Sequence, residues 1–94
     1  MDETLVLLEN IQQNMTLYPN PANNVIIVEF VGQTENSNLK MFDFSGRLRY
    51  ETQIDAGAKE VKIDIEDRDY DPGLYIVEMV INDQIFTEKV FVIK

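Results

Sequence analysis

Apolar residues recur at every second position through much of the chain, and turn-forming residues interrupt this pattern at short intervals. The clearest stretch is residues 61–65, where Val61, Ile63 and Ile65 alternate with charged side chains. Because successive side chains of a strand point to opposite faces, this alternation predicts strands with one buried and one solvated face. A series of such strands in a short chain predicts an all-β fold, a single seven-stranded antiparallel sandwich.

The predicted strands are at residues 15–18, 25–31, 39–44, 48–54, 61–65, 74–81 and 85–93. Pro19-Asn20-Pro21 ends the first strand, because proline removes a donor from the hydrogen-bond ladder. Asn82-Asp83 predicts a tight turn before the last strand. Seven aromatic residues fall within the predicted strands and are expected in the core, with a ligand-binding platform as the alternative: Phe30, Phe42, Phe44, Tyr50, Tyr75, Phe86 and Phe91.

Three residues are assigned mainly to turns. Asp43 stands where its carboxylate can accept hydrogen bonds from the backbone N–H groups of a following turn, and Gly46 can take the positive φ that such a hairpin needs. Gly73 stands before the sixth strand, where Tyr75 points inward. These residues are expected to act by keeping the domain folded.

Residues 1–14 do not share the alternating pattern. Residues 5–8 are apolar, and residues 9–14 are rich in amides. We interpret this segment as a linker, with an extra edge strand as the alternative, because an apolar stretch left in water invites pairing. The sandwich domain is predicted to cover residues 15–94.

Composition narrows the possible functions. With 17 acidic and 8 basic residues the chain carries a net charge of -9, so a nucleic-acid partner would be repelled. No apolar run approaches the roughly 18–20 residues of a membrane span, so membrane insertion is not expected. The chain lacks both Cys and His, which removes thiolate metal sites and the commonest general base. We expect no catalytic residues, no cofactor and no enzymatic activity.

One acidic segment needs a separate hypothesis. Asp67, Asp69 and Asp71 alternate in the manner of a calcium-binding loop, with Glu78 at the twelfth position. However, Pro72 occupies the sixth position, where such a loop needs glycine, and a strand would carry Glu78 away from the other carboxylates. The favoured interpretation is a solvated acidic turn, with calcium binding as the alternative.

Four short segments follow one another in a distinctive order. They are Leu17-Tyr18-Pro19-Asn20-Pro21-Ala22, Met41-Phe42-Asp43-Phe44-Ser45-Gly46-Arg47, Pro72-Gly73-Leu74-Tyr75 and Glu88-Lys89-Val90-Phe91-Val92-Ile93-Lys94. Together they resemble the C-terminal sorting domain of type IX secretion cargo, the type A domain of the Por secretion system. The resemblance covers residues 15–94.

This resemblance implies an immunoglobulin-like sandwich at the C-terminal side of a larger exported protein. It implies that the outer-membrane type IX translocon reads the domain, and that a sortase-like cysteine protease usually removes it and attaches the cargo to the cell surface. The cargo would be an N-terminal domain of the same chain. Its destination would be the cell surface or medium of a Gram-negative bacterium, reached through the periplasm.

The last strand is the predicted recognition element, comprising Lys89, Val90, Phe91, Val92, Ile93 and Lys94. A terminal strand offers a free edge or a free end, which partners bind by backbone pairing and side-chain pockets, and two cations in an acidic domain give a local contrast of charge. The alternative is that Lys89 and Lys94 only protect this edge from aggregation. The rival function is a generic immunoglobulin-like or fibronectin-like spacer or carbohydrate-adhesion module, which should tolerate additional sequence after the last strand.

Overall fold

The computed structural model describes residues 15–30, 37–66, 70–81 and 83–94, and every structural statement below refers to these residues. They form seven strands and no helix. The strands are β1 (Met15–Tyr18), β2 (Val25–Phe30), β3 (Ser37–Asp43), β4 (Leu48–Ile54), β5 (Glu60–Asp64), β6 (Gly73–Ile81) and β7 (Gln84–Val92). The prediction of an all-β domain is confirmed. The described part of the chain contains no helix long and apolar enough to cross a membrane.

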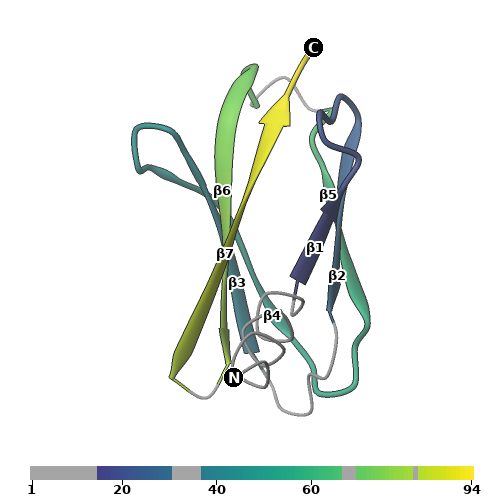
Figure 1. The fold of residues 1–94 in the computed structure, drawn as a ribbon, viewed down its shortest axis with the longest axis vertical. Helices are drawn as coiled ribbons and strands as arrows, with labels where there is room; N and C mark the ends of the chain where they lie inside the picture. The colour runs from purple at the N-terminus through teal and green to yellow at the C-terminus, as the bar shows by residue number, and fades with distance from the viewer. Residues whose placement is uncertain (1–14, 31–36, 67–69, 82) are drawn as a thin grey trace, which may run out of the picture.

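Two antiparallel sheets face each other (Figure 1). The smaller sheet has the strand order β1-β2-β5, and the larger has the order β4-β3-β6-β7. At one side of the molecule β1 contacts β7, so the two sheets approach each other there. The arrangement is consistent with an immunoglobulin-like sandwich. The β3–β4 hairpin and the carboxyl end of β7 lie at the same end of the molecule (Figure 1).

The core fills the space between the sheets with alternate residues of each strand. Its fully or nearly fully buried side chains include Ile26, Val28, Leu39, Met41, Ile63, Ile65, Tyr75, Val77, Met79, Val90 and Val92. In β5 the predicted register is confirmed, because Ile63 is buried opposite Ile26 whereas Lys62 is exposed. Burying this continuous apolar layer is the main favourable contribution to folding.

Two aromatic residues expected in the core are instead exposed. Phe44 lies beyond the end of β3, in the hairpin turn, and is 79% exposed. Phe91 belongs to β7 but points away from the core and is 53% exposed, because the buried positions of that strand are Val90 and Val92. The core prediction was therefore wrong for Phe44 and Phe91, and also for Phe42, which is half-buried on the outward face of β3. Phe30 and Tyr75 are buried as expected, and Tyr50 and Phe86 are partly buried against the core.

Several strand boundaries also differ slightly from those predicted. β3 runs from Ser37 to Asp43, so it begins two residues before the predicted strand at 39–44 and ends one residue before its predicted end. The fifth strand ends at Asp64, although the next residue, Ile65, is still buried. Before β7, Asp83 has a φ of 67°, as a tight positive-φ turn requires. Residues 1–14, predicted to be a linker or an extra edge strand, lie outside the described residues.

Candidate recognition site

The last strand combines folding residues and presented residues in one segment. β7 is at the edge of the larger sheet and pairs with β6, with Val92 opposite Gly73 and Val90 opposite Tyr75. The two valines are buried, whereas Lys89, Phe91, Ile93 and Lys94 are exposed. The six predicted recognition residues therefore divide into two valines that anchor the strand and four residues with exposed side chains.

The outer edge of β7 is not free over its last residues. Ala22 forms a parallel bridge to Val92, in which the Ala22 N–H donates to the Phe91 carbonyl at 2.8 Å and the Ile93 N–H donates to the Ala22 carbonyl at 2.8 Å. The expectation of a free edge is therefore wrong at this end of the strand. The reason is that the turn after β1 folds back along β7, which sequence alone did not indicate.

Asn20 extends this pairing with its side chain. Its Oδ1 accepts a hydrogen bond from the Phe91 N–H at 3.0 Å, and its Nδ2 donates to the Lys89 carbonyl at 3.4 Å. The carboxamide thus takes the place of a peptide group beside the strand. A side-chain donor is useful here because Pro19 and Pro21 have no N–H. The Tyr18-Pro19 and Asn20-Pro21 peptide bonds are both cis.

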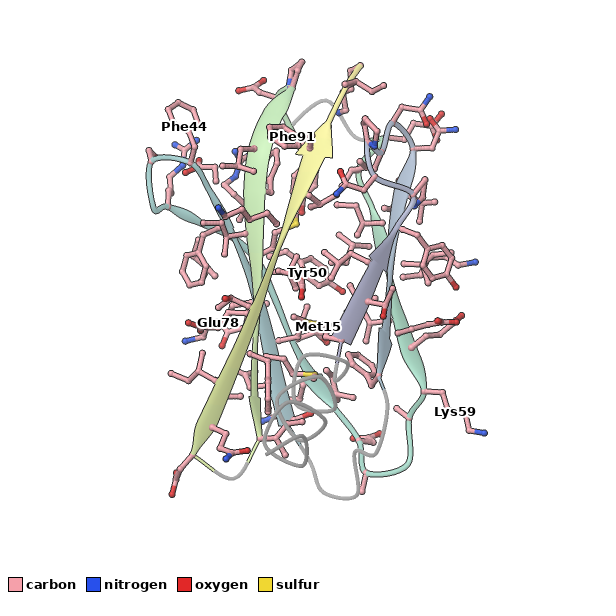
Figure 2. All side chains as sticks on the ribbon, viewed as in Figure 1. Met15, Phe44, Tyr50, Lys59, Glu78 and Phe91 are labelled. Carbon is pink, nitrogen blue, oxygen red and sulfur yellow. The ribbon has the colours of Figure 1, made fainter. Side chains whose placement is uncertain are left out.

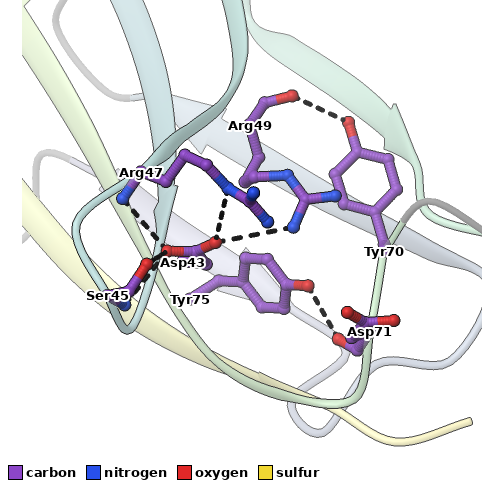
Figure 3. Close-up of polar contacts among 7 residues, drawn as sticks. All are labelled: Asp43, Ser45, Arg47, Arg49, Tyr70, Asp71 and Tyr75. Atoms are coloured by element: carbon purple, nitrogen blue, oxygen red, sulfur yellow. Dashed lines mark hydrogen bonds and ion pairs between the residues drawn. The ribbon is translucent and has the colours of Figure 1, made fainter.

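The predicted carboxylate-capped turn is confirmed at Asp43. One carboxylate oxygen, Oδ1, accepts hydrogen bonds from the Ser45 hydroxyl at 2.6 Å, the Ser45 N–H at 3.0 Å and the Arg47 N–H at 3.0 Å (Figure 3). The Gly46 N–H donates to the Asp43 carbonyl at 2.9 Å, and Gly46 has a φ of 90°. The Ser45 hydroxyl, helped by the two N–H groups and the Arg47 guanidinium, holds the pKa of Asp43 at about 2, although burial acts in the opposite direction.

The same carboxylate joins two of the sequence motifs. Asp43 Oδ2 lies 3.5 Å from Arg49 Nη1, and the Arg49 guanidinium lies 5.4 Å from the centre of the Tyr70 ring (Figure 3). The rings of Tyr70 and Tyr75 meet edge to face with their centres 6.2 Å apart, and the Tyr75 hydroxyl donates to the Asp71 carbonyl at 2.7 Å. Burial raises the pKa of the Tyr75 phenol. Sequence analysis missed Arg49 and Tyr70, because neither belongs to a turn motif or to a clear alternation.

Between these groups lies a small hollow of about 300 Å³, lined by Asp43, Phe44, Ser45, Arg47, Arg49, Asp71, Pro72, Gly73, Leu74 and Tyr75. Its charged groups are largely engaged with one another: Asp43 pairs with both arginines. The Tyr75 hydroxyl donates its hydrogen bond to the Asp71 carbonyl. The arrangement therefore fixes the β3–β4 hairpin against the start of β6.

The calcium hypothesis is not tested by this geometry. Two of its three proposed ligands, Asp67 and Asp69, lie outside the described residues, and the described part of the chain contains no cluster of three or more metal-ligating side chains. Glu78 is separated from Gly73 by five residues of extended strand, which is about 16 Å. Glu78 therefore does not belong to a site at the Asp71 turn, as expected from the sequence.

The described residues form a two-sheet antiparallel sandwich whose last strand is hydrogen-bonded along both edges at its carboxyl end and presents exposed side chains there. Comparison with known families places it more narrowly. The family model of the secretion system C-terminal sorting domain matches residues 16–94, and the chain belongs to this family. The chain thus carries a C-terminal sorting signal for type IX secretion. A search of the curated proteins gave no match.

Family membership confirms the resemblance drawn from the four sequence segments. It implies cargo on the N-terminal side in the same chain, type IX machinery that handles this cargo, and export to the cell surface or extracellular space. The family is one of sorting domains and not of enzymes. The rival hypothesis of a generic spacer or carbohydrate-adhesion module is not favoured by this match.

Proposed function

We propose that residues 15–94 are read by the outer-membrane translocon of type IX secretion through the segment from Lys89 to Lys94. A sortase-like cysteine protease then removes the domain and leaves the cargo on the surface of a Gram-negative bacterium. The domain works by being recognised, with no catalysis of its own. The observation that carries this proposal is the match of the sorting-domain family to residues 16–94, which is the whole of the folded sandwich except Met15.

The contacts around the motifs support this function. Asn20 and Ala22 of the first motif hold the outer edge of β7, and Val90 and Val92 hold its inner face in the core. The terminal segment is thereby kept in one position relative to the sandwich. A receptor gains affinity from such a preorganised ligand, because less conformational entropy is lost when the two bind.

Export of a reporter tests the proposal. Residues 1–94 are fused to the C-terminus of a periplasm-targeted fluorescent protein in a host that has type IX secretion. The reporter should reach the cell surface or medium, and it should stay in the periplasm of the same host lacking the translocon. Retention of the intact fusion in the competent host, or equal escape from both hosts, would refute the proposal.

Two variants separate recognition from folding in the same assay. Lys89→Ala combined with Lys94→Ala changes exposed side chains and should alter stability little, so a loss of export would indicate reading of the tail. Ile63→Ala removes a buried side chain far from the tail in sequence. Reduced export of this variant alone would show that folding, and not the tail, limits secretion.

A further inference from the structure

The outward faces of the two sheets differ in character. On the smaller sheet, cross-strand neighbours form polar rows such as Thr16, Glu29 and Glu60. This face also carries Lys62 and Asp64, with Tyr18 and Ile27 interspersed among the charged residues. Such a mixture of charged and apolar side chains is that of an ordinary solvated surface.

The outward face of the larger sheet is apolar at one end. One row across the four strands consists of Leu48, Phe42, Ile76 and Lys89, and the neighbouring pair on β6 and β7 is Leu74 and Phe91. A charged row follows, with Lys40 between Glu51 and Glu78. We call the apolar set of Phe42, Leu48, Leu74, Ile76 and Phe91 the apolar end.

The apolar end adjoins the C-terminal segment and is partly open to solvent, because Phe42, Leu74 and Ile76 are half-buried whereas its residues on the two edge strands are exposed. Leu48 is 45% exposed and Phe91 is 53% exposed, and Ile93, two residues further in the alternation, is 54% exposed. Phe91 and the hairpin residue Phe44 lie at the same end of the molecule as the C-terminus (Figures 1 and 2). Contiguous apolar surface of this kind is uncommon on small soluble domains and marks interaction sites.

Backbone groups of residues 89–93 are already hydrogen-bonded within the domain, which limits how a partner can bind. The outward carbonyl of Lys89, both backbone groups of Phe91 and the Ile93 N–H are hydrogen-bonded to Asn20 or Ala22. A partner strand could not pair with these groups without first displacing the Pro19–Ala22 segment. The side chains of Phe91 and Ile93, in contrast, are accessible as they stand.

Charge adds a second constraint on the partner. Lys89 closes the apolar row on the β7 side, next to Ile76, in a domain whose net charge is -9. A carboxylate placed opposite Lys89 would gain both attraction and orientation, whereas most of the remaining surface would repel it. The complementary surface is therefore an apolar groove with an acidic group at its margin.

We propose that a protein component of the export machinery docks on the apolar end through such a groove, with Phe91 as the main anchor, and leaves the Pro19–Ala22 segment in place. The inference rests on the proposed sorting function and adds the surface and the manner of recognition. It extends the recognised site from the terminal six residues to Phe42, Leu48, Leu74 and Ile76 on three other strands.

Substitutions along one strand test the position of the anchor. In the reporter fusion, Phe91→Ser should reduce the exported fraction about tenfold or more, since buried aromatic anchors dominate interface affinity. The matched control is Ile85→Ser, because Ile85 is 61% exposed on the same face of β7 but at its other end, opposite Val80. Phe91→Leu should retain most of the export. Thermal unfolding of each purified chain checks that the fold is kept.

An engineered disulfide, called the staple, tests whether the Pro19–Ala22 segment must leave the edge of β7 during export. Ala22 and Val92 are bridged neighbours, so their Cα atoms lie about 4.8 Å apart, within the roughly 4.4–6.8 Å that a disulfide spans. Because the chain has no cysteine, Ala22→Cys with Val92→Cys should form one disulfide in the oxidising periplasm. Side-chain docking predicts export equal to that of the unstapled Val92→Cys control, whereas displacement of the segment predicts retention.

The outcomes are separable. If the unchanged fusion is not exported, the proposed function itself fails. If it is exported but Phe91→Ser equals Ile85→Ser, or if the staple alone blocks export, the docking surface is refuted while the sorting function stands. Sedimentation of the purified chain checks a different occupant: a dimer that Phe91→Ser dissociates would assign this surface to a second copy of the chain and overturn the proposal.

Discussion

The closed edge of β7 makes a specific prediction for Asn20→Ala. This change removes the acceptor of the Phe91 N–H, at 3.0 Å, and the donor to the Lys89 carbonyl, at 3.4 Å. The second distance is beyond the usual range for such bonds, so the first carries most of the effect. A protein hydrogen bond contributes about 0.5–1.5 kcal/mol net, and water can replace the lost partner at this exposed site. We expect a loss of about 1 kcal/mol.

Two measurements check this prediction. The midpoint temperature of thermal unfolding should fall by about 4–8 °C for a domain of this size. Amide hydrogen exchange gives a site-specific result: the Phe91 amide should lose protection, whereas the Ile93 amide, bonded to the Ala22 carbonyl at 2.8 Å, should stay better protected. An unchanged exchange rate at Phe91 would refute the assignment of Asn20 as the group that closes the edge.

Two further predictions concern the core and the hairpin. Ile63→Ala should lower the free energy of unfolding by about 2–5 kcal/mol, whereas Lys62→Ala should lower it by less than about 0.5 kcal/mol, because only Ile63 is buried. Equal effects of the two substitutions in a denaturant titration would contradict the register of β5. The pKa of Asp43 is about 2 in the folded protein against an ordinary 3.8, so the unfolded chain binds a proton at Asp43 more readily. The ionised carboxylate therefore stabilises the fold above about pH 4, and this contribution is lost as the pH falls toward 2. Asp43→Asn should make the free energy of unfolding less dependent on pH between about pH 2 and 4. The same pH dependence in Asp43→Asn and in the unchanged protein would show that Asp43 does not stabilise the fold in this way.

The alternation of apolar and polar residues predicted the fold because burial in a sandwich depends on local period. In β5, Ile63 is buried and Lys62 is exposed, and each is decided by its position along one strand. The Asp43 turn was predictable for a similar reason, since a carboxylate accepts N–H groups two and four residues further along the chain. Contacts within one segment leave a pattern in the sequence.

Contacts between distant segments leave no such pattern. Asn20 and Phe91 are 71 positions apart, and no local feature of either residue indicates that one caps the other. The error at Phe91 has the same origin: apolar character favours the core, but the alternation set by Val90 and Val92 places Phe91 on the outside.

These long-range contacts also determine which experiments on the tail are informative. Deleting the terminal six residues would remove Val90 and Val92 from the core and would leave Asn20 and Ala22 without their partners on β7. Loss of export would then follow from unfolding whatever the translocon reads. Substitutions confined to outward side chains avoid this difficulty, because Lys89 and Phe91 contribute their backbones, and not their side chains, to the closed edge. A role in recognition must therefore be sought at these side chains while the strand beneath them is kept intact.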